Sequence, residues 1–268
     1  MGETVRPDLA PADEFEARQR LERSITALAL MVEGGAFDTE ADTCGLEVEL
    51  DLVDPLGRPR HVNAAVLAAL DRADVQAELG SFNIEFNVDS RPTHGLVLSR
   101  LDEELAGTLG AATAVAQGLG ARAVAVGILP TLHASDLTAG HLSTNPRYPY
   151  LDAKMAALRN RAVRLDIRGH EHLELETDSI AVEAAATSLQ VHVRAAPDTF
   201  ARFFNAAQAV SPALVAAAGN SPFLLGRRLW QETRIPLMEQ SLDTRATGSG
   251  PSDEPPRVWL GDRWAGAA

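Results

Sequence analysis

Residues 44–54 read Cys-Gly-Leu-Glu-Val-Glu-Leu-Asp-Leu-Val-Asp, so apolar and acidic side chains alternate along this stretch. In a β-strand alternate side chains point to the same face, which places Glu47, Glu49 and Asp51 in one row at intervals of about 7 Å. Like charges in such a row repel unless water screens them or a cation lies among them. The alternation therefore predicts a strand with an apolar face for packing and an acidic face that meets either solvent or a cation.

Two later segments repeat this alternation. Residues 83–89 read Asn-Ile-Glu-Phe-Asn-Val-Asp, and residues 188–194 read Ser-Leu-Gln-Val-His-Val-Arg. We expect the apolar faces of all three strands to pack on helices. The polar faces carry carboxylates, amides and one imidazole, with Arg194 as their only cation, whereas a sheet face that only meets water usually mixes charges of both signs. Oxygen ligands with an occasional histidine suit Mg²⁺ or Mn²⁺. The shared pattern predicts these metal ligands: Glu47, Glu49, Glu85 and His192. A solvated sheet face is the alternative.

The rest of the chain mixes helical periodicity with short strands and one hairpin, which favours an α+β fold with a mostly antiparallel sheet packed against helices. We expect residues 1–243 to form a single domain, followed by a loop rich in Gly, Pro and Ser and a chain end at residues 244–268. Asn63 is a candidate helix cap. The predicted helices cover residues 11–34, 61–73, 93–120, 149–161 and 197–219. The predicted strands cover residues 44–53, two pieces of 75–89 broken at Gly80 and Ser81, 121–130, a hairpin at 162–177 that turns at Gly169 and His170, and 187–194.

Composition excludes several classes of protein. The 268 residues carry 37 acidic and 24 basic side chains, a formal charge of −13, so bulk electrostatics argues against nucleic-acid binding. Cys44 is the only cysteine, which rules out an intrachain disulfide and fits a small core residue in a reducing compartment. The first residues lack the pattern of a signal peptide, and no apolar run reaches 18 residues. We therefore expect a soluble cytoplasmic protein without membrane contact.

Carboxylates that hold a divalent ion commonly bind polyphosphate. The sequence contains neither a P-loop nor a glycine-rich dinucleotide turn, so metal ions and arginines would have to handle the phosphates of ATP. The candidate arginines are Arg147, Arg227, Arg228 and Arg234. Other chemistries lack their motifs: there is no G-x-S-x-G elbow, and the histidines of His-Glu-His at 170–172 are spaced i, i+2 on a predicted turn. Aromatic residues, which stack sugars in glycosidases, are only 5% of the chain.

Six segments, in chain order, resemble the glutamate–cysteine ligase and carboxylate–amine ligase family over about residues 14 to 264: TCGLEVEL, ELGSFNIEFNV, AVGILPTL, NPRYPYL, TSLQVHV and GNSPFLLGRRLWQETRIPLMEQ. The resemblance implies a glutamine-synthetase-like catalytic core in which an antiparallel sheet cradles Mg²⁺-ATP. ATP would phosphorylate the γ-carboxylate of glutamate, and the amine of cysteine would attack the acyl phosphate. Position by position, the resemblance again implies metal ligation by Glu47, Glu49, Glu85 and His192. It places Glu78 and Gln190 beside the metals or the nucleotide, and it makes Arg234 a contact to substrate or phosphate.

Members of this family extend beyond the point where this chain ends, so the resemblance implies an incomplete, C-terminally truncated core. We expect an open sheet edge, which invites association, including homo-oligomers. Three alternatives to the glutamate–cysteine ligase remain open. They are a ligase that uses another amine, a non-catalytic remnant that binds nucleotide or partner chains, and a metal-dependent hydrolase.

Overall fold

The computed structural model describes residues 11–37, 42–245, 255–259 and 261–266. Much of the predicted loop at residues 244–268 falls outside these ranges. The helices are α1 (Pro11–Glu33), α2 (Asn63–Leu70), α3 (Val97–Gly118), α4 (Arg147–Arg159), α5 (Pro197–Ala218) and α6 (Arg234–Ser241), with short 3₁₀ turns η1 (Ala134–Asp136), η2 (Ala139–His141) and η3 (Ile180–Ala185). The strands are β1 (Thr43–Val53), β2 (Val75–Ala77), β3 (Asn83–Pro92), β4 (Arg122–Val124), β5 (Val163–Arg168), β6 (His172–Thr177), β7 (Leu189–Arg194), β8 (Phe223–Leu224) and β9 (Arg227–Arg228).

Strand β1 is the centre of a five-stranded sheet in which every pairing is antiparallel. It pairs with β3 along one edge, while its other edge is shared by β7 in its first half and β4 in its last three residues. β2 extends the sheet beyond β3. Mixed helices and antiparallel strands confirm the α+β fold class, with the first predicted strand at the middle of the sheet.

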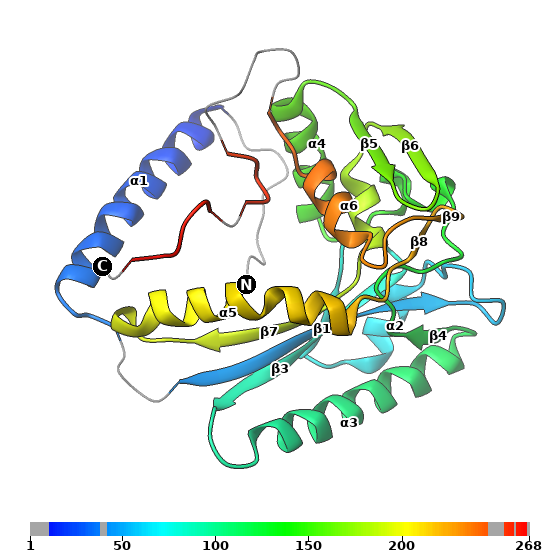
Figure 1. Ribbon diagram of the computed structural model, residues 1–268. Coiled ribbons are helices and arrows are strands. Elements are labelled where there is room, and N and C mark those ends of the chain that lie inside the picture. Colours follow the sequence, from blue (N-terminus) through cyan, green and yellow to red (C-terminus); the bar gives the residue numbers. More distant parts are fainter. Residues whose placement is uncertain (1–10, 38–41, 246–254, 260, 267–268) are drawn as a thin grey trace.

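Helices α2 and α3 cover one face of this sheet, and Figure 1 shows α3 running beneath the strands. The covered side chains are the apolar half of the alternation: Val48, Leu50 and Leu52 of β1, with Ile84 and Phe86 of β3. All five are buried, and they pack with alanines of α3 that allow close approach of the helix. The prediction that apolar strand faces pack on helices is thus confirmed for β1 and β3.

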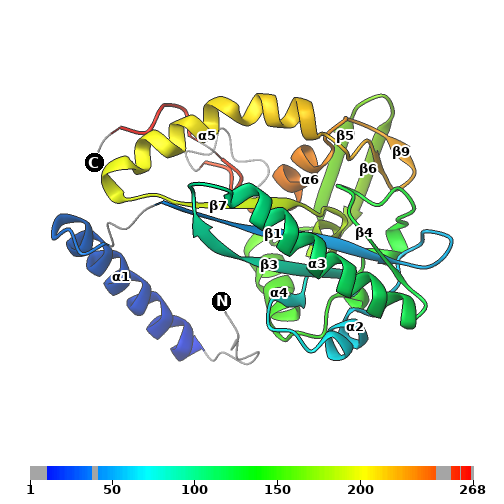
Figure 2. The same ribbon diagram turned by 90° about the horizontal axis from the view of Figure 1, so that it is seen from below.

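The same prediction is wrong for β7. Its apolar residues Leu189, Val191 and Val193 are 55%, 58% and 50% exposed. The reason is that α3 lies under β1 and β3, whereas α5, which follows β7 and runs alongside it in Figures 1 and 2, buries none of its own residues. The alternation of apolar side chains therefore predicted the strand correctly, but it did not predict whether a helix covers the apolar face of that strand.

A second hydrophobic core joins the β5–β6 hairpin to α4, α6 and η3. Leu165 and Ile167 of β5 pack with Met155 of α4, Ile180 of η3 and Leu237 of α6. Figure 1 shows this unit on the side of the sheet opposite α3, at the end of β1 that carries Val53. The predicted hairpin and its turn are confirmed. The unit flanks the polar face of the sheet and supplies residues at its border.

Several predicted details differ from the structure. β4 is confined to Arg122–Val124, because the chain then leaves the edge of β1 and enters the second core. α4 starts at Arg147, two residues before the predicted position. Asn63 is not a cap, because Val62 holds the N-cap position. The buried Asn63 amide nitrogen instead lies 2.7–3.2 Å from Oγ of Ser143 and from the carbonyl oxygens of residues 80 and 83.

Helix α1 forms as predicted, but it makes little contact with the other described elements. Its apolar side chains are exposed, and Figure 2 shows the helix lying apart from the sheet. Among the described residues, no helix is both long enough and apolar enough to cross a membrane.

Candidate metal centre on the polar face of the sheet

Strand register brings the acidic residues together. Glu49 of β1 lies directly opposite Glu85 of β3, and Glu47 lies between Asn87 of β3 and Gln190 of β7. Directly paired residues of antiparallel strands point to the same face with their Cβ atoms about 5 Å apart. The polar halves of the three alternating strands therefore form one continuous surface, opposite the face that α3 covers.

Three carboxylates converge on this surface: Glu49, Glu78 and Glu85 each place an oxygen within 4.8 Å of the other two. Glu78 follows β2, two residues after Gln76, which pairs with Glu85. Glu85 is buried, and the other two are partly buried. Three carboxylate oxygens at this separation are a donor set suited to a hard divalent cation.

The electrostatics of the cluster reflect burial and crowding of like charges. Burial, followed by the neighbouring charges of Glu49 and Glu85, raises the pKa of Glu78 to about 7. Burial is also the largest cause that raises the pKa of Glu49, and the charge of Glu85 adds to it. Each group takes up protons more readily than a free carboxylate does, and a bound cation would reverse this tendency.

Hydrogen-bond donors hold two of these carboxylates in place. The backbone N–H of Ser188 donates to Oε2 of Glu49 at 2.8 Å, and the amide of Gln190 donates to Oε1 at 3.2 Å. The amides of Gln76 and Asn87 donate to Oε1 of Glu85 at 2.5 and 3.1 Å. Such partners of metal ligands fix the orientation of the ligand oxygens. Gln190, which the resemblance placed beside the metals, therefore lies against Glu49.

Glu47 and His192 lie on the same face but pair with each other. Nε2 of His192 is 3.1 Å from Oε2 of Glu47, and their side chains are 55% and 29% exposed. They stand next to the three-carboxylate cluster along β1, since Glu47 precedes Glu49 by two residues. The structure thus groups Glu49 and Glu85 with Glu78, and it sets the other two predicted ligands at the solvent side of that group. Their role as ligands stays a prediction.

The row of acidic side chains on β1 ends at Asp51, which forms a fully buried pair with Asn83 of β3. The amide of Asn83 donates to Oδ1 of Asp51 at 2.7 Å, while Oδ2 of Asp51 and Oδ1 of Asn83 have no hydrogen-bond partner among the described residues. Burial, followed by the charge of Glu49, raises the pKa of Asp51 well above its usual value. This end of the acidic row favours a protonated carboxyl, so it supplies less negative charge than the sequence pattern suggests.

Two of the candidate arginines border the cluster from opposite sides. Arg147 begins α4, and its Cζ lies 5.5 Å from the ring centre of Tyr148. Its positive charge offsets a small part of the rise in the pKa of Glu78. The Tyr148 hydroxyl donates to the carbonyl of residue 77, next to Glu78, at 2.8 Å. Arg227 and Arg228 belong to the small β8–β9 sheet instead.

Arg234 lies at the other border and is held by two acceptors. Its Nε and Nη2 donate to Glu232 at 2.5 and 2.6 Å, and its Nη1 donates to the carbonyl of Thr187 at 2.7 Å. Sequence reasoning missed Glu232 and Gln76. Residues 75–79 alternate apolar and polar side chains in their own right, so a local signal was present for Gln76. No local pattern indicated Glu232.

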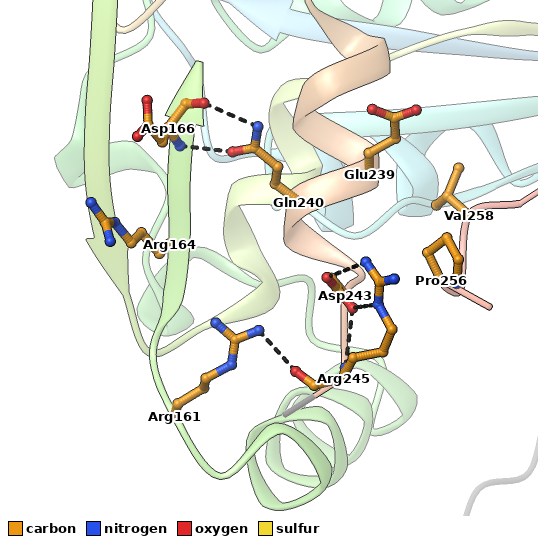
Figure 3. A pocket seen from close by; sticks show the side chains of 9 residues that line it. All are labelled: Arg161, Arg164, Asp166, Glu239, Gln240, Asp243, Arg245, Pro256 and Val258. Carbon is orange, nitrogen blue, oxygen red and sulfur yellow. Dashed lines mark hydrogen bonds and ion pairs between the residues drawn. The ribbon is translucent and has the colours of Figure 1, made fainter. Parts of the chain in front are cut away.

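A separate hollow of about 520 Å³ lies between β5, the end of α6 and the segment around residue 256. Figure 3 shows an ion pair between Arg245 and Asp243, and a hydrogen bond from Arg161 to the carbonyl of Arg245. Among the described residues, a close group of three metal-ligating side chains is found on the sheet face and not in this hollow. The hollow is lined by Arg161, Arg164, Asp166, Glu239, Gln240, Asp243, Arg245, Pro256 and Val258.

A comparison with known protein families matches most of the chain. The sequence model of glutamate-cysteine ligase family 2 (GCS2) matches residues 43–256, from the first residue of β1 to beyond α6. No curated protein matches the chain. The matched range contains all three converging carboxylates, the Glu47–His192 pair and both bordering arginines. The chain belongs to glutamate-cysteine ligase family 2.

Proposed function

We propose that this chain is an ATP-dependent carboxylate–amine ligase that joins the γ-carboxylate of glutamate to the amine of cysteine through an acyl phosphate. Mg²⁺ or Mn²⁺ is the proposed cofactor and ATP a substrate. Family membership supports the ligase class. The single cysteine and the acidic surface support a cytoplasmic protein that does not bind nucleic acid.

One observation carries the proposal: oxygens of Glu49, Glu78 and Glu85 lie within 4.8 Å of one another on the polar face of the sheet. The fit to a divalent cation rests on the chemistry of these donors. All are carboxylate oxygens, burial and mutual repulsion raise the pKa of two of them, and neighbouring donors orient two of them. A solvated face would gain nothing from bringing three acids this close.

In this proposal Glu49, Glu78 and Glu85 hold the metal ion, with Glu47 and His192 as further ligands. A bound Mg²⁺ supplies neutralising charge for the phosphoryl oxygens of ATP. Arg147 and Gln190 contact the nucleotide from the two sides of the cluster, and Arg234 lies at the border where substrate or phosphate enters.

The protein must also align ATP, the carboxylate and the amine for the two chemical steps. A carboxylate resists attack by an amine because it is already an anion and offers only an oxide as a leaving group. Phosphorylation converts that oxide into phosphate, and the acyl phosphate must then meet the amine before water does. The face of the sheet between α4 and α6 is the surface on which the proposal places these three reactants.

The test measures ADP release by the 268-residue chain with Mg²⁺, ATP and glutamate, with and without cysteine. ADP formation that depends on cysteine supports the proposal, and a panel of other amines tests a ligase with a different acceptor. Nucleotide binding without turnover would favour a non-catalytic protein. Product formed without ATP would favour a hydrolase. Glu49→Gln should abolish turnover, whereas Glu176→Gln, an exposed acid on β6, should leave it unchanged.

A further inference from the structure

A chain of hydrogen bonds connects a buried carboxylate outside the sheet to Glu49. Its first link is Glu232, which is 9% exposed and accepts a hydrogen bond from Oγ of the fully buried Ser221 at 2.6 Å. The two carboxylate oxygens of Glu232 accept hydrogen bonds from Nε and Nη2 of Arg234. A two-pronged pair of this kind fixes the plane of the guanidinium as well as its position.

The backbone next to β7 forms the second link. The third nitrogen of Arg234 donates to the carbonyl of Thr187, whose own N–H donates to the carbonyl of Gly127 at 3.0 Å. The hydroxyl of Thr187 donates to the carbonyl of Val126. Every polar group of Thr187 is therefore engaged, and this residue is 2% exposed.

The next residue forms the last link. Ser188 is joined to Glu49 twice, because its N–H donates to Oε2 at 2.8 Å and its carbonyl accepts from the Glu49 N–H at 2.9 Å. The peptide group between Thr187 and Ser188 thus has its carbonyl on Arg234 and its N–H on a carboxylate of the cluster. Since a peptide group is planar, fixing the carbonyl also fixes the direction of the N–H.

Gly127 shows how closely the guanidinium is held. A Cβ atom at this position would lie 3.0 Å from Cζ of Arg234 and 2.3 Å from Oδ1 of Asn220. The arginine therefore passes directly against the backbone of residue 127, which leaves it little freedom to swing toward the cluster.

We propose that Glu232 is a positioning residue that acts through Arg234 and the Thr187–Ser188 peptide to aim the Ser188 N–H at Glu49. The consequence for metal affinity rests on the proposed function, whereas the positioning itself does not. Direct hydrogen-bond partners of metal ligands typically change metal affinity 10–100-fold when they are lost, and the Ser188 N–H is such a partner of Glu49.

The first test follows the Ser188 amide by hydrogen exchange in the metal-free protein. Glu232→Gln, which keeps an acceptor for Ser221, should accelerate exchange of this amide about 10-fold, and Arg234→Lys should do the same. Asp243→Asn is the matched control, because Asp243 and Arg245 form another two-pronged pair two residues apart (Figure 3). It should leave the Ser188 amide unchanged. Unaltered exchange in folded Glu232→Gln would overturn the proposal.

The second test titrates Mn²⁺ without nucleotide. Glu232→Gln should bind Mn²⁺ about 10-fold more weakly than the parent, and Asp243→Asn should stay within about twofold. If Arg234→Lys weakens ATP binding but changes neither Mn²⁺ affinity nor Ser188 exchange, the arginine is a nucleotide contact and the positioning role is wrong. A parent chain that binds no Mn²⁺ would refute the proposed metal site, and the exchange experiment would still decide the role of Glu232.

Discussion

The two faces of the central sheet are formed by alternating residues of the same two strands, β1 and β3, yet they are organised in different ways. On one face Leu50 and Ile84 are buried in a hydrophobic core that α2 and α3 help to form. On the other face Glu49 and Glu85 stand opposite each other and are held by amides and backbone N–H groups. The period of two sets both faces at once, so one strand can contribute to stability and to a ligand site independently.

This separation has a cost on the acidic face only. Repulsion between the crowded carboxylates destabilises the fold when no cation is bound, whereas burial of the apolar face stabilises it and offsets this repulsion. We therefore expect substitutions on the two faces to have opposite profiles: loss of stability on one, and loss of metal binding with little loss of stability on the other.

The largest effect should follow from Phe86→Ala on the apolar face. Phe86 is fully buried between β1, β3 and α3, so its truncation leaves a cavity and should lower the free energy of unfolding by about 3–5 kcal/mol. Urea unfolding measures this. Leu56→Ala, at an exposed position, is the control. A loss below 1 kcal/mol would mean that this face is not a packed core.

Glu49→Gln should produce the reverse profile. Mn²⁺ affinity should fall about 100-fold, because a ligand is lost, while the free energy of unfolding of the metal-free protein should stay within about 1 kcal/mol of the parent. Isothermal titration and urea unfolding on the same preparations measure both quantities. Unchanged Mn²⁺ binding would remove Glu49 from the ligand set.

The pH dependence of stability should also distinguish the acidic face. Burial raises the pKa of Glu78 to about 7 from 4.5, so the folded state binds this proton more tightly than the unfolded state does. Stability should therefore fall as pH rises from about 4.5 to about 7, by on the order of 2 kcal/mol for this group. Glu78→Gln should remove that contribution in urea unfolding of the metal-free protein.

Glu183 provides the contrast for this measurement. Burial raises its pKa to about 7 as well, but it lies in η3 and is not one of the converging carboxylates. Millimolar Mg²⁺ should reduce the contribution of Glu78 to the pH dependence of the free energy of unfolding. It should leave the contribution of Glu183 unchanged. The variants Glu78→Gln and Glu183→Gln measure the two contributions separately. Equal flattening of both parts would show that Mg²⁺ acts generally rather than at the sheet face.

The smallest effect should come from Val191→Ser on β7. Although Val191 continues the apolar alternation, it is 58% exposed, so this change should alter the free energy of unfolding by less than about 0.5 kcal/mol. A loss above 1 kcal/mol in dilute protein would indicate that the apolar side of β7 is covered in solution.

Much of the fold was predictable because its signals are local. The period of two identified β1, β3 and β7, and the helices predicted from the sequence match α1, α3 and α5 with ends within a few residues. Asn63 shows where local reasoning fails. Its amide suits a helix cap, but residues distant in sequence offered acceptors in the interior, and a buried amide must satisfy its hydrogen bonds.

In the candidate site, too, some features follow from the local sequence and others depend on tertiary contacts. Alternation alone determined that Glu47 and Glu49 share the polar face of β1 and that Glu85 lies on the polar face of its own strand, since side-chain direction in a strand depends only on position along it. Tertiary structure decided that Glu49 opposes Glu85, that Glu78 joins them, and that His192 turns to Glu47. It also decided the partners of Arg234. Register, loop placement and buried ion pairs depend on contacts between residues far apart in the chain, and no local period encodes those contacts.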